Sequence, residues 1–192
     1  MARPIEYDRN AVLEQAMHVF WSTGYCGTSM NQLVESTGLK PGSLYGAFQS
    51  KEQLFIAALE CYGQRTVAVV DAMLQSAASP MAGIRNFIDW IVADVTSRTS
   101  HGCLLVNTTL ELSAQNGTVR AMVNGYFEAI RERLANSLQQ ARDIGELSTD
   151  KNPQELSMML ICMVWGLRVM GETNPSPVQL AMIKRQLLAL LA

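Results

Sequence analysis

Residues 29–48, SMNQLVESTGLKPGSLYGAF, constrain the fold of this chain more than any other stretch. Ser29 and Gln32 have the spacing of a capping box, which opens a helix. Gly38 suits the left-handed conformation in which a helix ends, and Pro41 suits the first position of the next helix. Two short helices around a glycine turn are typical of a DNA-binding helix-turn-helix, with an ordinary helical hairpin as the alternative.

The second of these helices has distinct inner and outer faces. Leu44 and Phe48 are four residues apart, so both point inward from the same side of the helix. The remaining face presents small, polar and cationic residues, as a helix that enters the major groove of DNA would: Lys40, Ser43, Tyr45, Gly46 and Ala47.

Length and composition indicate a globular protein with a buried core. The chain has 192 residues, of which 48% are hydrophobic, so it can bury a sizeable core. Its first residues lack the apolar segment of a signal peptide, and its longest apolar run, residues 158–167, is too short to cross a bilayer. The four cysteines form no C-x-x-C pair, which favours free thiols. We expect a cytoplasmic protein with no membrane partner.

The charge balance is unusual for a protein that binds DNA. The net charge is −2, and residues 1–65 carry five basic and six acidic side chains. Because a basic domain is the usual mark of a DNA-binding protein, the acidic balance predicts modest affinity per monomer and reliance on dimerisation. Arg3, Lys40 and Lys51 are the cations that we expect on the DNA-facing surface.

Apolar residues recur at helical spacing along the chain, and no segment has the alternation of a strand. The sequence therefore predicts an all-α fold of nine helices. Besides the helix-turn-helix, they are expected over about residues 10–22, 51–78, 81–96, 103–112, 118–142, 153–172 and 177–191, with Gly24 ending the first.

The segment from Thr28 to Phe55 resembles the N-terminal domain of the TetR family of transcriptional regulators. Its features are the glycine turn, the K-x-G-x-L-Y motif, an aromatic residue, and then S-K-E-x-L-F. The nine-helix plan and the G-C-L-L-V-N-T stretch at residues 102–108 are also similar to the family. The resemblance implies a homodimeric regulator, most often a repressor, which a small ligand releases from a palindromic operator. It divides the chain into a helix-turn-helix domain (1–50) and a helical effector-binding and dimerisation domain (51–192).

The resemblance also implies which residues contact double-stranded DNA. Backbone N–H groups at helix N-termini suit phosphate oxygens, and Lys51 in the first turn of the fourth helix suits another phosphate. Many relatives have tyrosine or histidine where this chain has Gly46 and Ala47, so DNA shape is expected to carry much of the specificity. The expected DNA contacts are Thr28, Ser29, Lys40, Pro41, Gly42, Ser43, Tyr45, Gly46 and Lys51.

An effector pocket is expected to be apolar with a few polar groups, and so to take a small, largely apolar molecule. Alternatively, its aromatic residues are simply core. Cys103 offers a further alternative, because a thiol at a helix start near His101 has the setting of an electrophile or oxidant sensor. The candidate ligand contacts are Tyr62, Phe87, Trp90, Cys103, Asn107, Glu111, Tyr126 and Phe127.

The last two helices are expected to form the dimer interface, with Trp165, Val169, Ile183 and Leu187 as anchors. A competing function is that of a helical small-molecule-binding protein with no role on DNA, which the acidic N-terminal domain favours. The sequence has no nucleophile–base pair, phosphate loop or metal-ligand spacing, so we expect no enzyme activity, cofactor or metal. Activation of transcription, in place of repression, stays open.

Overall fold

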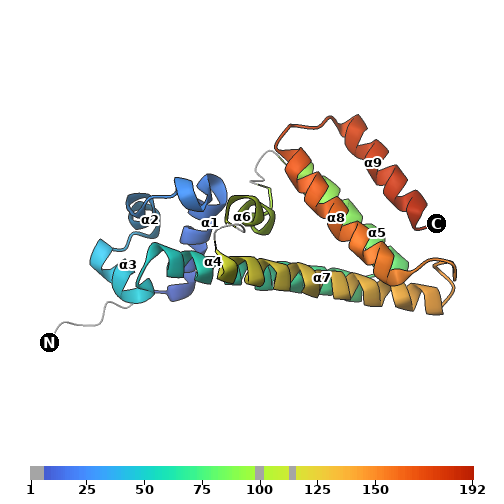
Figure 1. Ribbon diagram of the computed structural model, residues 1–192, viewed down its shortest axis with the longest axis horizontal. Coiled ribbons are helices and arrows are strands. Elements are labelled where there is room, and N and C mark those ends of the chain that lie inside the picture. Colours follow the sequence, from blue (N-terminus) through green and yellow to red (C-terminus); the bar gives the residue numbers. More distant parts are fainter. Residues whose placement is uncertain (1–6, 98–101, 113–115) are drawn as a thin grey trace. The chain divides into compact units, whose positions relative to one another are not determined.

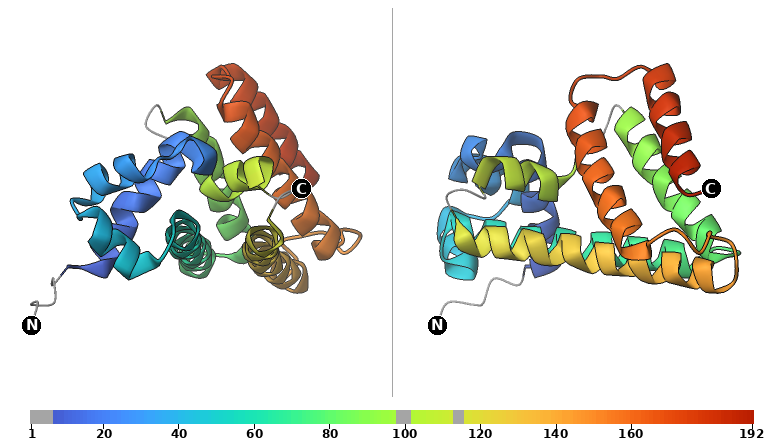
Figure 2. Two further views of the ribbon diagram at one scale, coloured as in Figure 1. Left: turned by 60° about the vertical axis from the view of Figure 1, so that its left-hand side comes forward. Right: turned by 45° about the vertical axis from the view of Figure 1, so that its right-hand side comes forward.

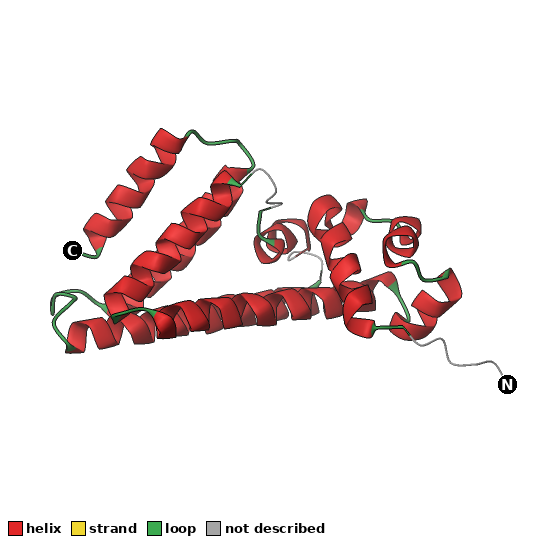
Figure 3. Ribbon diagram, turned by 180° about the vertical axis from the view of Figure 1, so that it is seen from behind, coloured by secondary structure: helices red, strands yellow, loops and turns green. Residues whose placement is uncertain are grey.

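A computed structural model describes residues 7–97, 102–112 and 116–192 of the chain (Figure 1). All regular secondary structure in these residues is α-helical, as Figure 3 shows, which confirms the all-α prediction of nine helices for the described chain. The helices are α1 (Arg9–Gly27), α2 (Met30–Thr37), α3 (Pro41–Phe48), α4 (Lys51–Ser76), α5 (Pro80–Thr96), α6 (Leu104–Leu112), α7 (Gly117–Asp143), α8 (Pro153–Gly171) and α9 (Pro177–Leu190).

Local capping signals explain most helix boundaries. The Ser29 side chain accepts a hydrogen bond from the Gln32 backbone N–H, and the Gln32 side chain accepts one from the Ser29 backbone N–H. Ser176 and Gln179 form the same reciprocal box at the start of α9. Gly38 ends α2 in the left-handed conformation, with φ of 67°. These contacts confirm the predicted turn of the helix-turn-helix.

The first helix is longer than predicted. Gly24 breaks it as expected, with φ of 72° and ψ of 171°, but the chain resumes a helical turn and continues to Gly27. Glycine adopts this left-handed φ at little cost, whereas another residue would be strained. The resumed turn places Tyr25 and Cys26 directly after the break.

The described chain forms two compact units. The first contains described residues of 1–64 and 103–123, and the second contains those of 65–102 and 124–192. The first unit includes α6 because this helix packs against α1 (Figure 2). In the second unit, α5 packs against both α8 and α9. These units differ from the predicted domains, which meet at residue 50. The division into a DNA-binding domain (1–50) and an effector-binding and dimerisation domain (51–192) stays a prediction.

Each unit has its own apolar core. In the first unit the predicted inner residues Leu44 and Phe48 are 1% and 4% exposed, and Phe20 is completely buried. The second unit buries one face of α5, including Ile84, Phe87 and Ile88. Among the described residues, no helix is both long and apolar enough to span a membrane.

Candidate nucleic-acid interface

The outer face of α3 is open and built from small residues. Lys40 precedes the helix with extended backbone angles, and Pro41 takes the first helical position. Tyr45 is 48% exposed, and Lys40 is exposed as well. A Cβ atom added to Gly42 or Gly46 would meet nothing within 4 Å, so this face leaves room for a close approach of another molecule. The structure thus places the predicted DNA contacts of α3 together on an accessible surface, with Ser43 half-buried at its edge.

The N-terminus of α2 contains one exposed and one buried candidate. Ser29 is exposed, and its hydroxyl group bonds to Gln32 at 2.8 Å. Thr28 is only 2% exposed, and its hydroxyl group donates to the Gly24 carbonyl at 2.6 Å. The structure therefore places the Thr28 side chain inside the protein, where it supports the connection to α2. The predicted DNA contact of Thr28 stays a prediction.

Lys51 also has contacts within the protein. Its Nζ donates to the Thr28 carbonyl oxygen at 2.6 Å and lies 4.4 Å from the centre of the Tyr25 ring. The prediction that Lys51 neutralises a phosphate did not anticipate this tether, which fixes the position of the charge beside the start of α2. Arg3, expected on the same surface, lies outside the described residues.

Glu111 on α6 holds the end of α1. Its carboxylate accepts hydrogen bonds from the backbone N–H of Tyr25 at 2.9 Å and of Cys26 at 2.6 Å. A Cβ atom on Gly24 would lie 3.0 Å from Glu111 Oε2, so glycine also allows this close approach. The hydrogen bond to Glu111, followed by desolvation, raises the pKa of the Cys26 thiol. The prediction of Glu111 as a ligand contact did not anticipate these two hydrogen bonds and stays a prediction.

The other candidate effector residues of the first unit are largely packed. Tyr62 contacts the Trp21 ring, with ring centres 5.1 Å apart, and Asn107 is half-buried. Cys103 is 5% exposed, and burial raises the pKa of its thiol. A buried thiol with a raised pKa is mostly protonated at neutral pH, which weakens the case for an electrophile sensor. His101, its expected neighbour, lies outside the described residues.

The four cysteines allow a direct check of this point. We expect iodoacetamide at pH 7.5 to label exposed Cys26 at least about tenfold faster than Cys103, because only an accessible thiolate reacts and Cys103 is shielded. Mass spectrometry of the labelled peptides measures both rates in one sample. Equal rates would show that Cys103 is accessible and would restore the sensor hypothesis.

The aromatic candidates of the second unit belong mainly to its core. Phe87 is 1% exposed and packs against the half-buried Trp90. Phe127 is 6% exposed, and its ring centre lies 4.8 Å from that of Trp165. Tyr126 is half-buried. Phe127 also lines a cavity of about 200 Å³, together with Asn124, Glu128, Arg131, Met158 and Ile161.

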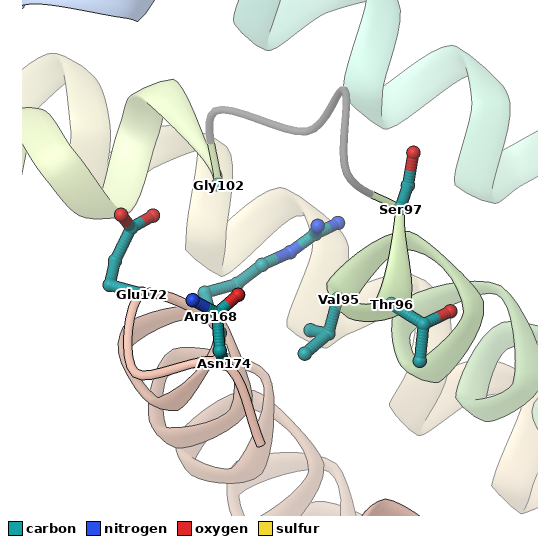
Figure 4. A pocket seen from close by; sticks show the side chains of 8 residues that line it. Val95, Thr96, Ser97, Gly102, Arg168, Glu172 and Asn174 are labelled. Atoms are coloured by element: carbon teal, nitrogen blue, oxygen red, sulfur yellow. The ribbon is translucent and has the colours of Figure 1, made fainter. Parts of the chain in front are cut away.

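A second cavity, of about 220 Å³, contains a buried arginine (Figure 4). Arg168 extends from α8 toward the end of α5, is 5% exposed and forms an ion pair with Asp94. Its guanidinium carbon lies 5.6 Å from the centre of the Trp90 ring. Sequence reasoning missed this cavity, although an arginine inside the apolar sequence of α8 was a usable signal. This cavity is lined by Val95, Thr96, Ser97, Gly102, Arg168, Gly171, Glu172 and Asn174.

Helices α8 and α9 expose apolar side chains that a folded monomer would ordinarily bury. Val169, one predicted anchor, is 44% exposed, and Trp165 and Ile183 are half-buried. Leu187 is only 7% exposed and faces the interior of its own unit, so its prediction as an interface anchor is corrected. The exposed large apolar residues of these helices are Met158, Met159, Val169, Val178, Met182 and Leu190.

Comparison with known proteins agrees with this architecture. Residues 12–58 match the family described as bacterial regulatory proteins, tetR family, and residues 80–186 match the tetracyclin repressor-like C-terminal domain. The HTH-type transcriptional repressor ComR of Escherichia coli K12 is 31% identical over 176 residues, which cover 91% of this chain and 84% of ComR. The HTH-type transcriptional repressor DhaR of a Mycobacterium species is 25% identical over 88% of this chain and 85% of its own.

Solved structures show the same fold. A cysteine mutant of the TetR family regulator CifR, in complex with 26-bp double-stranded operator DNA, superposes with a TM-score of 0.82 at 29% identity over the whole of both chains. Reduced NemR of E. coli gives a TM-score of 0.86 at 20% identity over 96% of this chain and 97% of its own, which supports the fold alone. The family models, the repressor relative and the DNA-bound structure together define the class as DNA-binding transcriptional regulators. The chain belongs to the TetR family.

Proposed function

We propose that this cytoplasmic regulator is a repressor that binds a palindromic operator as a homodimer and leaves it when a small effector binds. The observation that carries the proposal is the accessible outer face of α3, where Lys40 and Tyr45 are exposed and two glycines leave room for close approach to DNA. In support, ComR is described as a repressor, and the solved structure of a CifR cysteine mutant is a complex with operator DNA.

Dimerisation is supported by the apolar surface of α8 and α9. A twofold dimer would bury the same patch of each subunit, including Met158, Val169 and Met182. Two recognition helices about 34 Å apart would then read two half-sites one turn apart. The dimer also offsets the weak electrostatic attraction expected from the acidic composition of residues 1–65.

The effector is proposed to be small. Both described cavities, at about 200 and 220 Å³, are below the roughly 300–1,000 Å³ of pockets for drug-sized ligands. The cavity beside Phe127, with Met158 and Ile161 in its wall, supports the expectation of a largely apolar molecule. The cavity beside Arg168 would suit a more polar one, since Thr96, Ser97 and Asn174 also line it.

Binding of DNA from the region upstream of its own gene, measured at several salt concentrations, tests the proposal. Lys40→Ala is expected to weaken binding and to lower the slope of log K against log salt by about one per subunit, because one phosphate contact is lost. Arg85→Ala, which removes an exposed cation of α5, is the matched control and should leave the slope unchanged.

The outcome separates the competing functions. Selective binding that weakens with salt and with Lys40→Ala supports a regulator. Binding no tighter than to random DNA, followed by failure to select any genomic fragment, would contradict the proposal. It would favour a helical small-molecule-binding protein without a role on DNA.

A further inference from the structure

We infer that Glu111 is a positioning residue for DNA binding, because its carboxylate holds the turn on which Lys51 and the start of α2 depend. The inference rests on the proposed function of the helix-turn-helix. It assigns to α6 a task in the DNA-binding unit, although Glu111 follows Tyr25 by 86 residues in the sequence.

Glu111 contacts the resumed turn of α1 directly. The non-helical backbone angles of Gly24 interrupt α1 directly before Tyr25 and Cys26. The Glu111 carboxylate accepts hydrogen bonds from the backbone N–H groups of both, at 2.9 and 2.6 Å. Hydrogen bonds to a charged acceptor are about twice as strong as neutral ones, so this contact can fix the turn.

Tyr25 connects this turn to the helices of the proposed DNA-binding surface. The Tyr25 ring lies 4.4 Å from Lys51 Nζ and 4.9 Å from the centre of the Phe55 ring, so the side chain is anchored against α4. Lys51 Nζ in turn donates to the Thr28 carbonyl at 2.6 Å. Thr28 directly precedes Ser29, which caps α2. The turn at Tyr25 thereby sets the position of both Lys51 and the N-terminus of α2.

This arrangement is sensitive to the position of Glu111. Both hydrogen bonds require donor–acceptor distances below about 3.2 Å, so a displacement of Glu111 by roughly 1 Å away from α1 would break both. The three heavy atoms nearest to a Cβ atom built on Gly24 all belong to Glu111, so the contact depends on this one side chain. The position of α6 is consequently a determinant of whether the helix-turn-helix has its DNA-binding geometry.

Operator binding by Glu111→Ala provides the test. The probe is a DNA fragment selected from genomic DNA with the wild-type protein, used at constant salt. Removal of a carboxylate makes the protein less acidic, so general electrostatics predicts tighter binding, whereas loss of positioning predicts binding weaker by about tenfold or more. Glu60→Ala removes an exposed carboxylate of α4 and is the matched control, with unchanged or slightly tighter binding expected.

A double-mutant cycle distinguishes positioning from general destabilisation. If Glu111 acts through Lys51, Glu111→Ala should weaken binding by less than about threefold in a Lys51→Met background, because coupled residues are not additive. Glu111→Gln, whose amide oxygen can accept one of the two hydrogen bonds, should restore part of the affinity. Equal losses in both backgrounds would overturn the inference.

Two measurements on the protein without DNA follow the contact itself. Amide hydrogen exchange at Tyr25 and Cys26 should accelerate in Glu111→Ala, and alkylation of Cys26 should become faster because Glu111 raises the pKa of that thiol. Wild-type affinity and unchanged exchange in Glu111→Ala would overturn this inference alone. A wild-type protein that selects no DNA would overturn the proposed function and the role of Glu111 with it.

Discussion

Replacing Phe20 with alanine is expected to lower the free energy of unfolding by about 3–5 kcal/mol, the usual cost of deleting a buried phenylalanine ring. Phe20 is completely buried, and its ring meets that of Phe55 edge to face with centres 5.0 Å apart. The Tyr25 ring is 6.3 Å away on the same cluster. The substitution therefore leaves a cavity between α1 and α4 that rigid neighbours fill poorly.

Urea denaturation followed by circular dichroism measures this loss, at one fixed protein concentration because dimerisation couples to stability. Tyr45→Ala is the control, since its ring is 48% exposed and its removal should change stability by less than about 0.5 kcal/mol. A loss below about 1 kcal/mol for Phe20→Ala would mean that the cluster around Phe55 repacks.

Features of the fold that depend on neighbouring residues were predictable from the sequence. The Ser29–Gln32 box and the left-handed Gly38 were identified because caps are satisfied within a few residues, and local chemistry decides them. The exposed face of α3 was predictable for the same reason, because Leu44 and Phe48 fix which side points inward. Gly24 was recognised as a break, but nothing local indicated that a helical turn resumes after it.

Features that depend on distant residues were not predictable. Glu111 was predicted to be a polar contact of an otherwise apolar ligand pocket, and only the packing of α6 against α1 brings its carboxylate to Tyr25. Periodicity placed Leu187 on an apolar face of α9 but could not tell whether α5 or a second subunit covers that face. Thr28 was similar, since its burial follows from the geometry of the resumed turn.

The burial of Leu187 narrows the set of residues that can form the proposed dimer interface. With Leu187 assigned to the interior, the interface is left to side chains that the single chain exposes, of which Val169 on α8 and Met182 on α9 are examples. Lys184 on α9 pairs with Asp89 on α5 at 2.6 Å, which helps to fix α9 on its own subunit. The exposed apolar side chains of α8 and α9 therefore lie on helices that are held in place within their own subunit.

Aspartate in place of Val169 is expected to separate the dimer and to lower operator affinity by about 10²–10⁴-fold, the usual gain from joining two binding modules. Twofold symmetry introduces the charge twice, so each dimer would bury two unpaired carboxylates. The monomer should tolerate the change because Val169 is 44% exposed in the single chain. Val69→Asp on α4 is the matched control, since Val69 is 46% exposed and lies on neither of the two proposed interface helices.

Analytical ultracentrifugation and operator binding should be measured on the same preparations of both variants. Val169→Asp is expected to sediment as a monomer at micromolar concentration, while Val69→Asp stays dimeric with wild-type affinity. Met182→Asp tests the α9 side of the same surface and should behave like Val169→Asp. If Val169→Asp and Met182→Asp both remain dimers that bind operator normally, the subunits associate elsewhere, and the exposed apolar residues of α8 and α9 need another explanation.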